Sequence, residues 1–224
     1  MAHGLDAIEI ETAPAPRAAV IWMHGLGADG HDFEPIVPEL DLAGAPPLRF
    51  VFPHAPVRPV TINGGAVMRA WYDVFDQDGV RREDGAGVRA SQREIEALIE
   101  REKQRGLGAA TIILAGFSQG GAMALQTGLR YPERLAGIAA LSTFLPLADT
   151  LAVEATAANR DVPIFMAHGT VDPVIPLSRG RRSRDRLLAL DYRIDWREYP
   201  MPHAVCAEEI ADLSAWLRGV LTAP

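Results

Sequence analysis

The sequence has a single cysteine, Cys206, in 224 residues. One cysteine cannot form an internal disulfide framework, so the chain fits a reducing compartment. Long hydrophobic runs are also missing, because the longest uncharged apolar stretch, residues 135–148, is too short to span a bilayer. The N-terminal segment is acidic and lacks the basic and apolar regions of a signal peptide. We therefore expect a cytoplasmic protein without a membrane span.

A surplus of positive charge is absent as well. The chain has 22 Lys and Arg against 29 Asp and Glu, which gives a net charge of −7. Binding to nucleic acid or to an anionic lipid surface relies on clustered Lys and Arg, so we expect neither as the main partner. The one tight basic cluster, Arg179 to Arg186, has helical spacing and includes Asp185. It indicates a solvated helix face, with an anion or partner site as the alternative.

What is present is an ordinary globular composition, 48% hydrophobic and 23% charged. No repeat or linker divides the chain, so we predict a single domain over residues 1–224. Short apolar runs rich in β-branched residues predict strands, and helical patterns lie between them. The predicted strands are residues 18–23, 48–52, 111–115, 135–141, 162–167 and 194–199, and the predicted helices are residues 88–105 and a final one containing Ile210, Leu213, Leu217 and Val220.

This alternation predicts an α/β fold with a mostly parallel central sheet and helices on both faces. Ligands bind at the carboxyl ends of the strands in such folds. One glycine pattern there, residues 25–30 (GLGADG), matches a dinucleotide-binding motif. However, Pro35 and Pro38 interrupt the helix that this motif requires, and the next strand ends without the ribose-binding carboxylate. We therefore set aside a nucleotide-binding oxidoreductase.

A second pattern, residues 116–120 (GFSQG), is G-x-S-x-G between a predicted strand and a helix. This context is typical of a nucleophile elbow, with Ser118 as the nucleophile. A serine hydroxyl needs a histidine as base and a carboxylate to orient it, in the chain order Ser, Asp or Glu, His. Only His168 and His203 follow Ser118.

His203 is the candidate base, because it lies in a loop between the last strand and the last helix. His168 ends a predicted strand, and no acid between Ser118 and His168 follows a strand end, so we assign it to supporting the next loop. Asp172 lies in that loop and is the candidate acid. The other acids considered lie before a strand or in a helical stretch and rank far below: Asp161, Asp185 and Asp191.

An acyl-transfer oxyanion also needs donors, which are usually backbone N–H groups. One is expected from Gln119, after the nucleophile, and the other from Leu26 in the loop His24-Gly25-Leu26-Gly27. We expect His24 to shape this loop, with a direct substrate contact as the alternative. No cofactor is required, and no metal-ligand spacing such as H-E-x-x-H is present.

Five ordered segments together resemble the acyl-protein thioesterase/phospholipase/carboxylesterase family of α/β hydrolases, from about Val20 to the C-terminal helix. They are HGLGADG, GFSQGGAMAL, ALSTFLPL, ANRDVPIFMAHGTVDPVIP and YPMPH. The resemblance implies the α/β-hydrolase fold, a catalytic triad at Ser118, Asp172 and His203, and oxyanion amides at Leu26 and Gln119. Residues 76–87 are charged and glycine-rich, in a part of the chain that varies between such enzymes.

The acyl-binding side chains are less sharply defined by the sequence. Trp71, Phe144 and Leu145 are candidate substrate-binding residues, with packing in the core, or a lid for the latter two, as the alternatives. Their surroundings are apolar, and we expect nothing basic nearby that would bind a phosphate or a free carboxylate. Apolar surface near such a lid makes a homodimer plausible.

We therefore predict a serine hydrolase that cleaves carboxylic esters and thioesters of short-to-medium acyl chains through an acyl-enzyme intermediate. Its substrate is expected to be a small-molecule or lipid acyl ester, or an acylated protein. The alternatives are an acyl-protein thioesterase or lysophospholipase acting on long chains, and a non-catalytic α/β-hydrolase scaffold that only binds a ligand.

Overall fold

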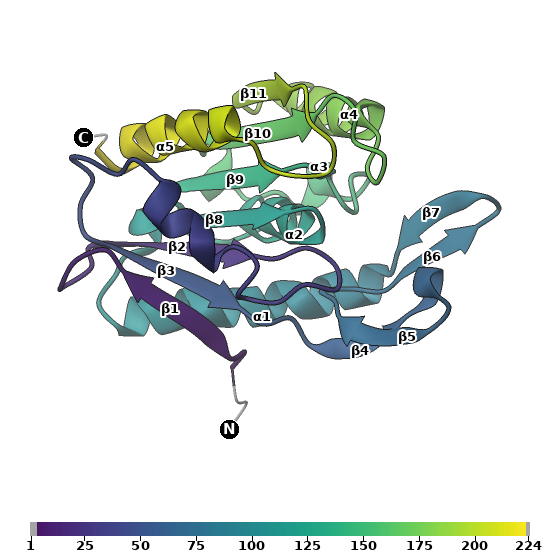
Figure 1. The fold of residues 1–224 in the computed structure, drawn as a ribbon, viewed down its shortest axis with the longest axis horizontal. Coiled ribbons are helices and arrows are strands. Elements are labelled where there is room, and N and C mark those ends of the chain that lie inside the picture. Colours follow the sequence, from purple (N-terminus) through teal and green to yellow (C-terminus); the bar gives the residue numbers. More distant parts are fainter. Residues whose placement is uncertain (1–3, 223–224) are drawn as a thin grey trace.

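A computed structural model describes residues 4–222 and contains a seven-stranded central sheet (Figure 1). The strand order is β1-β3-β2-β8-β9-β10-β11, and every neighbouring pair is parallel except β1 with β3. The strands are β1 (Ala7–Glu11), β2 (Ala18–Met23), β3 (Leu48–Pro53), β8 (Ile112–Phe117), β9 (Gly137–Leu141), β10 (Ile164–Gly169) and β11 (Ile194–Tyr199). The predicted mostly parallel sheet is confirmed.

Helices cover both faces of this sheet. The α-helices are α1 (Gly85–Gln104), α2 (Gln119–Gly128), α3 (Leu151–Glu154), α4 (Leu177–Leu188) and α5 (Ala207–Thr222), and the short 3₁₀ helices are η1 (Glu34–Glu39), η2 (Thr61–Asn63), η3 (Ala109–Thr111) and η4 (Ala157–Asn159). Side chains of α1, α2 and α4 pack on one face, with Ile21 and Leu114 of the strands. Those of η1 and α5 pack on the other face, with Phe50 and Phe165.

The observed ends of several elements differ from those predicted. Strands β8 and β10 each extend two residues further toward the carboxyl end of the sheet than expected. Helix α1 begins at Gly85 rather than residue 88, because the Asp84 carboxylate accepts hydrogen bonds from the N–H groups of Ala86 and Gly87 and so caps the helix. Strand β1 was not predicted; it is a half-buried edge strand that alternates apolar and acidic residues.

Two hairpins that were also not predicted lie beyond the carboxyl ends of the parallel strands (Figure 1). The first joins β4 (Val57–Val60) to β5 (Ala66–Arg69), and the second joins β6 (Val74–Gln77) to β7 (Val80–Glu83). The second hairpin turns at Asp78 and Gly79, which both have positive φ, as tight two-residue hairpin turns require. The variable stretch at residues 76–87 is therefore ordered structure beside the ligand-binding edge of the sheet.

Among the helices of residues 4–222, none is both long enough and apolar enough to cross a membrane.

Candidate active site

Ser118 lies in a sharp turn between β8 and α2 and has φ 55° and ψ −119°. A left-handed backbone is unfavourable for any residue with a side chain, and close packing around the turn maintains it here. A Cβ on Gly120 would overlap the Met23 carbonyl, and one on Gly116 would overlap the backbone of Gly120. The turn is further held by the Ser118 N–H, which donates to the Leu141 carbonyl at 2.9 Å. The G-x-S-x-G spacing therefore follows from close backbone packing.

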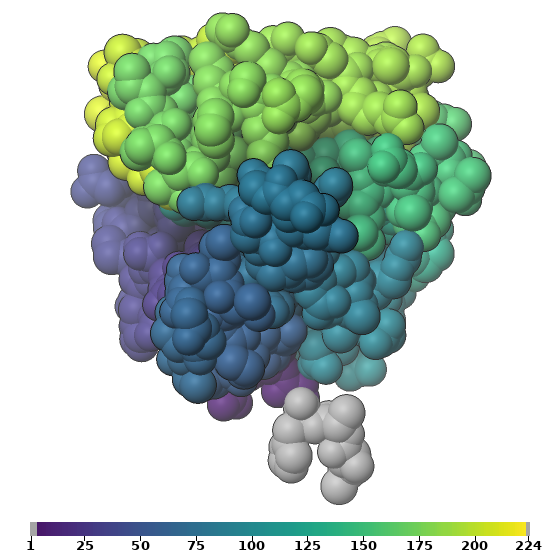
Figure 2. Space-filling model, turned by 90° about the vertical axis from the view of Figure 1, so that its right-hand side faces the viewer, coloured from purple at the N-terminus to yellow at the C-terminus, as the bar shows by residue number. Residues whose placement is uncertain are grey.

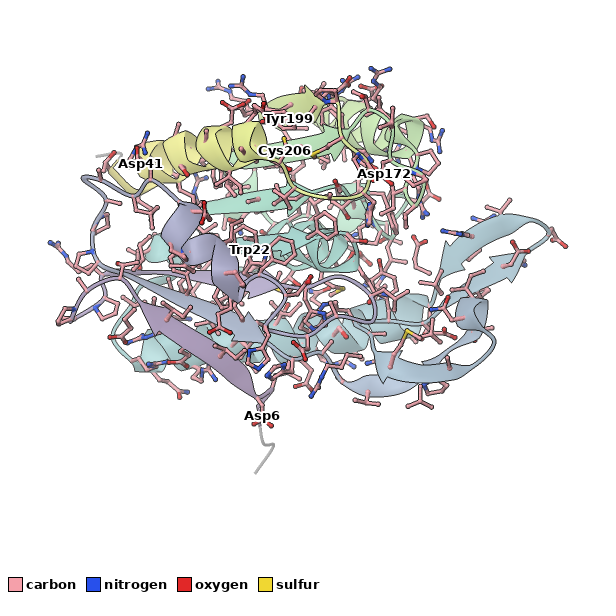
Figure 3. All side chains as sticks on the ribbon, in the orientation of Figure 1. Asp6, Trp22, Asp41, Asp172, Tyr199 and Cys206 are labelled. Carbon is pink, nitrogen blue, oxygen red and sulfur yellow. The ribbon has the colours of Figure 1, made fainter. Side chains whose placement is uncertain are left out.

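The structure brings Ser118, His203 and Asp172 together at the carboxyl end of the sheet, where Figure 3 labels Asp172. The His203 Nε2 atom lies 2.9 Å from the Ser118 hydroxyl oxygen. The His203 Nδ1 atom lies 2.6 Å from the Asp172 Oδ2 atom. A carboxylate can only accept here, so Nδ1 carries the proton and Nε2 is free to accept from the hydroxyl. The three residues follow β8, β10 and β11, as the sequence predicts.

The Asp172 carboxylate has a fixed orientation. Its Oδ1 atom accepts hydrogen bonds from the backbone N–H groups of Val174 at 2.8 Å and Ile175 at 2.9 Å, which leaves Oδ2 for His203. The buried His168 supports the same loop, because its Nε2 atom bonds the Ile175 carbonyl at 2.8 Å. Burial lowers the pKa of His168, so this side chain stays neutral and structural.

His24 organises the early glycine-rich loop. Its Nδ1–H donates to the Gly25 carbonyl at 2.7 Å, and its Nε2 accepts from the Ala55 N–H at 3.0 Å. Burial lowers the pKa of His24 to about 4, so the ring is neutral in the one tautomer that satisfies both bonds. The Trp71 indole N–H donates to the His24 carbonyl at 3.0 Å and ties the loop to the core.

Leu26 and Gln119 line the pocket together with Ser118. The Gln119 side chain joins the serine turn to the segment before β6: its Oε1 accepts from the Trp71 N–H at 2.7 Å, and its Nε2 donates to the Tyr72 carbonyl at 2.8 Å. The backbone N–H groups of Leu26 and Gln119 donate to no acceptor within residues 4–222. Both N–H groups are therefore available to a bound substrate.

A pocket of about 290 Å³ opens at Ser118. Phe144 lines it, as expected, but Trp71 and Leu145 do not. Trp71 is fully buried with its N–H on the His24 carbonyl, and the buried Leu145 donates its backbone N–H to Ser183 Oγ at 2.9 Å. These two side chains pack in the core, so we assign them no contact with substrate.

The expectation that nothing basic lies near the acyl pocket is wrong. Arg81, Arg82 and Arg179 all line it, together with Glu83. The first two come from strand β7, which was not predicted, and Arg179 comes from the first turn of α4. The Arg179 guanidinium stacks on the Phe144 ring, 3.4 Å from its centroid. The Asp78-Gly79 dipeptide, a typical two-residue hairpin turn, is the sequence signal that predicts this hairpin.

Within the described residues, no three His, Cys, Asp or Glu side chains are grouped so that they could hold a metal ion. The site therefore consists of a serine, a histidine and a carboxylate in a hydrogen-bonded chain, with two free backbone N–H groups and a partly apolar pocket beside them. This arrangement matches what acyl transfer through a serine nucleophile requires.

Comparison with known proteins agrees with this chemistry. The model of the phospholipase/carboxylesterase family matches residues 5–221. The chain belongs to this family. Family membership confirms the resemblance seen in the sequence and identifies an ester- or thioester-hydrolysing enzyme.

Individual members of the phospholipase/carboxylesterase family align over most of the chain. Acyl-protein thioesterase 1 of Gibberella zeae is 39% identical over 215 residues, covering 90% of this chain and 89% of the relative. Acyl-protein thioesterase 1 of Neurospora crassa is 41% identical over 214 residues, with coverages of 89% and 85%.

Solved structures also resemble the chain over most of its length. The crystal structure of Arabidopsis thaliana SOBER1 superposes with a TM-score of 0.84 at 30% identity, covering 92% of this chain and 100% of that one. Zea mays acyl-protein thioesterase 2 superposes with a TM-score of 0.83 at 28% identity, with coverages of 96% and 100%. The α/β-hydrolase fold is thereby confirmed.

Proposed function

We propose that the protein is a serine hydrolase that cleaves carboxylic esters and thioesters of short-to-medium acyl chains through an acyl-enzyme intermediate. The observation that carries the proposal is the pair of hydrogen bonds made by His203, one to the Ser118 hydroxyl at 2.9 Å and one to Asp172 at 2.6 Å. A ligand-binding scaffold has no need for a hydroxyl, an imidazole and a carboxylate aligned in this way.

In the proposed mechanism, the Ser118 Oγ atom attacks the acyl carbonyl carbon while His203 Nε2 takes the hydroxyl proton. Asp172 stabilises the resulting imidazolium. The oxyanion of the tetrahedral intermediate accepts hydrogen bonds from the N–H groups of Leu26 and Gln119. Collapse of the intermediate breaks the bond to the leaving group, which receives the proton from His203. Water, deprotonated by His203, then attacks the acyl-enzyme and releases the carboxylic acid and the free serine.

The size and lining of the pocket support a short-to-medium acyl chain. Its volume of about 290 Å³ lies near the small end of the range for ligand pockets, roughly 300–1,000 Å³. Its apolar lining comes from the loops after β2, β9 and β10 and from both hairpins, and includes Leu26, Ile62, Val74, Phe144 and Ile175. An acyl chain placed there gains hydrophobic stabilisation until the pocket is full.

We expect kcat/KM to rise from acetyl to medium-chain esters and thioesters and then to flatten or fall. Each methylene buried should add about 0.8 kcal/mol, or roughly a fourfold gain in kcat/KM. Kinetics on esters and thioesters of graded chain length test this. A steady decline from acetyl would contradict the apolar pocket, and no hydrolysis at any length would contradict the serine hydrolase itself.

A second candidate function is an acyl-protein thioesterase or lysophospholipase acting on long acyl chains. The names of the fungal relatives favour it, since both are called acyl-protein thioesterase 1. In the same kinetic series it predicts a rise that continues to palmitoyl. The proposal also includes three predictions made from the sequence. The substrate can be an acylated protein, the location is cytoplasmic, and the protein forms a homodimer.

The oxyanion loop gives a separate prediction, because its proposed donor is a main-chain group. Leu26→Ala should keep most of kcat, since the N–H remains. Leu26→Pro should remove the donor and lower kcat roughly 10²–10³-fold. Circular dichroism checks that each variant is folded, and steady-state kinetics give the result. An equal loss in both variants would assign the effect to the leucine side chain instead.

A further inference from the structure

The pocket at Ser118 continues into a groove of about 610 Å³ that carries more arginine. The two share the side chains of β7 and the first turn of α4, and the groove adds Arg182. Figure 2 shows this end of the molecule, with the hairpin next to the segment that follows β10. The Arg81 guanidinium joins them by donating to the Val174 carbonyl at 3.3 Å. The arginines that line the pocket and groove are Arg81, Arg82, Arg179 and Arg182.

Negative charge does not balance these four guanidinium groups. Among residues 4–222, Glu83 is the only acidic side chain that lines either space, and it lies 3.4 Å from Arg179. The side chains of Arg82 and Arg182 form no hydrogen bond or ion pair within residues 4–222. By contrast, two other arginines of α4 are paired, Arg181 with Glu198 and Arg184 with Asp185.

The arginines are close enough to repel one another. Burial lowers the pKa of Arg179 and the Glu83 carboxylate raises it, while the charges of Arg182 and Arg81 lower it further, although the guanidinium stays protonated. Its stacking on Phe144 fixes its position at the border between the apolar and the basic parts of the pocket. An anion bound among these side chains would relieve the repulsion and accept several charge-assisted hydrogen bonds.

We propose that Arg81, Arg82, Arg179 and Arg182 form an oxyanion-binding subsite that selects esters whose leaving group carries a phosphate or carboxylate. This inference rests on the proposed hydrolase function. The apolar side chains nearest Ser118 suit the acyl chain, whereas the arginines lead into the more open groove, where a charged alcohol or thiol can remain partly solvated. Charged groups bind there at lower desolvation cost than in the apolar pocket.

A set of butanoate esters that differ only in the alcohol tests the subsite. The alcohols are glycerol, glycerol 3-phosphate, 3-hydroxypropanoate and choline, which supply a neutral, a phosphate, a carboxylate and a cationic group. We expect kcat/KM for an anionic ester to exceed that for the glycerol ester about tenfold, and the choline ester to be the poorest substrate. Added salt should reduce the preference, because it screens the exposed charges.

Arginine variants test whether these side chains cause the preference for anionic esters. In Arg82→Gln/Arg182→Gln, the ratio of kcat/KM for anionic over neutral esters should fall to near one. Arg184→Gln is the matched control: Arg184 is on the same helix but lines neither space, so the ratio should keep its wild-type value. A preference for the phosphate ester alone, or for the carboxylate ester alone, supports the subsite and identifies its ligand.

Two results would overturn the subsite. One is a wild-type ratio near one at low salt, and the other is a ratio unchanged in the double variant. If the proposed hydrolase function is wrong, the result is different, because no ester of the set is then cleaved. If all four esters are cleaved at the same rate, the hydrolase function stands and the anion subsite does not.

Discussion

Replacing Ser118 by alanine should lower kcat for every ester at least about 10⁴-fold, because the residues of a triad act as a unit and the nucleophile is then missing. The fold should be retained, since the loss is one oxygen atom whose one hydrogen bond within the described part of the chain is to His203. For the same reason, Ser118→Ala/His203→Ala should be little worse than either single variant. Steady-state kinetics and thermal melts followed by circular dichroism measure both effects.

A fluorophosphonate probe gives an independent check. It should modify the wild type on the peptide that contains Ser118 and should leave Ser118→Ala unmodified, as mass spectrometry would show. Activity above a tenth of the wild-type value in Ser118→Ala would mean that the nucleophile is another residue.

Asp172→Asn should lower kcat about 10³–10⁴-fold, although only one oxygen is exchanged for an NH₂ group. The amide has one orientation that suits the loop, because the N–H groups of Val174 and Ile175 require an acceptor where Oδ1 now lies. The NH₂ group must then face His203 Nδ1 and donate to it. The ring proton moves to Nε2, which can no longer accept the proton of the Ser118 hydroxyl.

Asp185→Asn is the control for the acid, because it makes the same chemical change on α4, where the carboxylate pairs with Arg184. Its kcat should lie within about twofold of the wild type, since exposed ion pairs contribute little. Full activity in Asp172→Asn would direct the search for the orienting acid to another carboxylate.

The sequence predicts those strands and helices whose pattern of apolar and polar residues is strongest. Strands β2, β8 and β10 are buried on both faces and appear as short apolar runs that no other element type explains as well. Strand β1 is half-buried and pairs with β3, which is distant in sequence, so local pattern gives little sign of it. Strand β7 pairs with the adjacent β6, but three of its four residues are charged, and only the Asp78-Gly79 turn indicates it.

The active site, too, is predicted in part from the sequence: the catalytic residues are found, but most of the pocket lining is not. Ser118, Asp172 and His203 each follow a strand, and parallel topology brings such residues to one edge. Which side chain of a loop faces the pocket is not encoded locally: Phe144 lines it, whereas the adjacent Leu145 points into the core. The basic groove depends on a hairpin and a helix that are far apart in the chain, so neither segment alone indicates it.

The order of the strands also has a consequence for how the protein matures. His203 follows β11, which is an edge strand and the last strand to be synthesised, and it is separated by 85 positions from the serine whose hydroxyl it bonds. Contacts between such distant residues carry a large loop-closure entropy and form only when the intervening elements are in place. A partly folded chain can therefore complete the turn around Ser118 early and still lack an activated nucleophile. We therefore expect a chain that has not yet placed β11 to hydrolyse esters far more slowly than the folded protein.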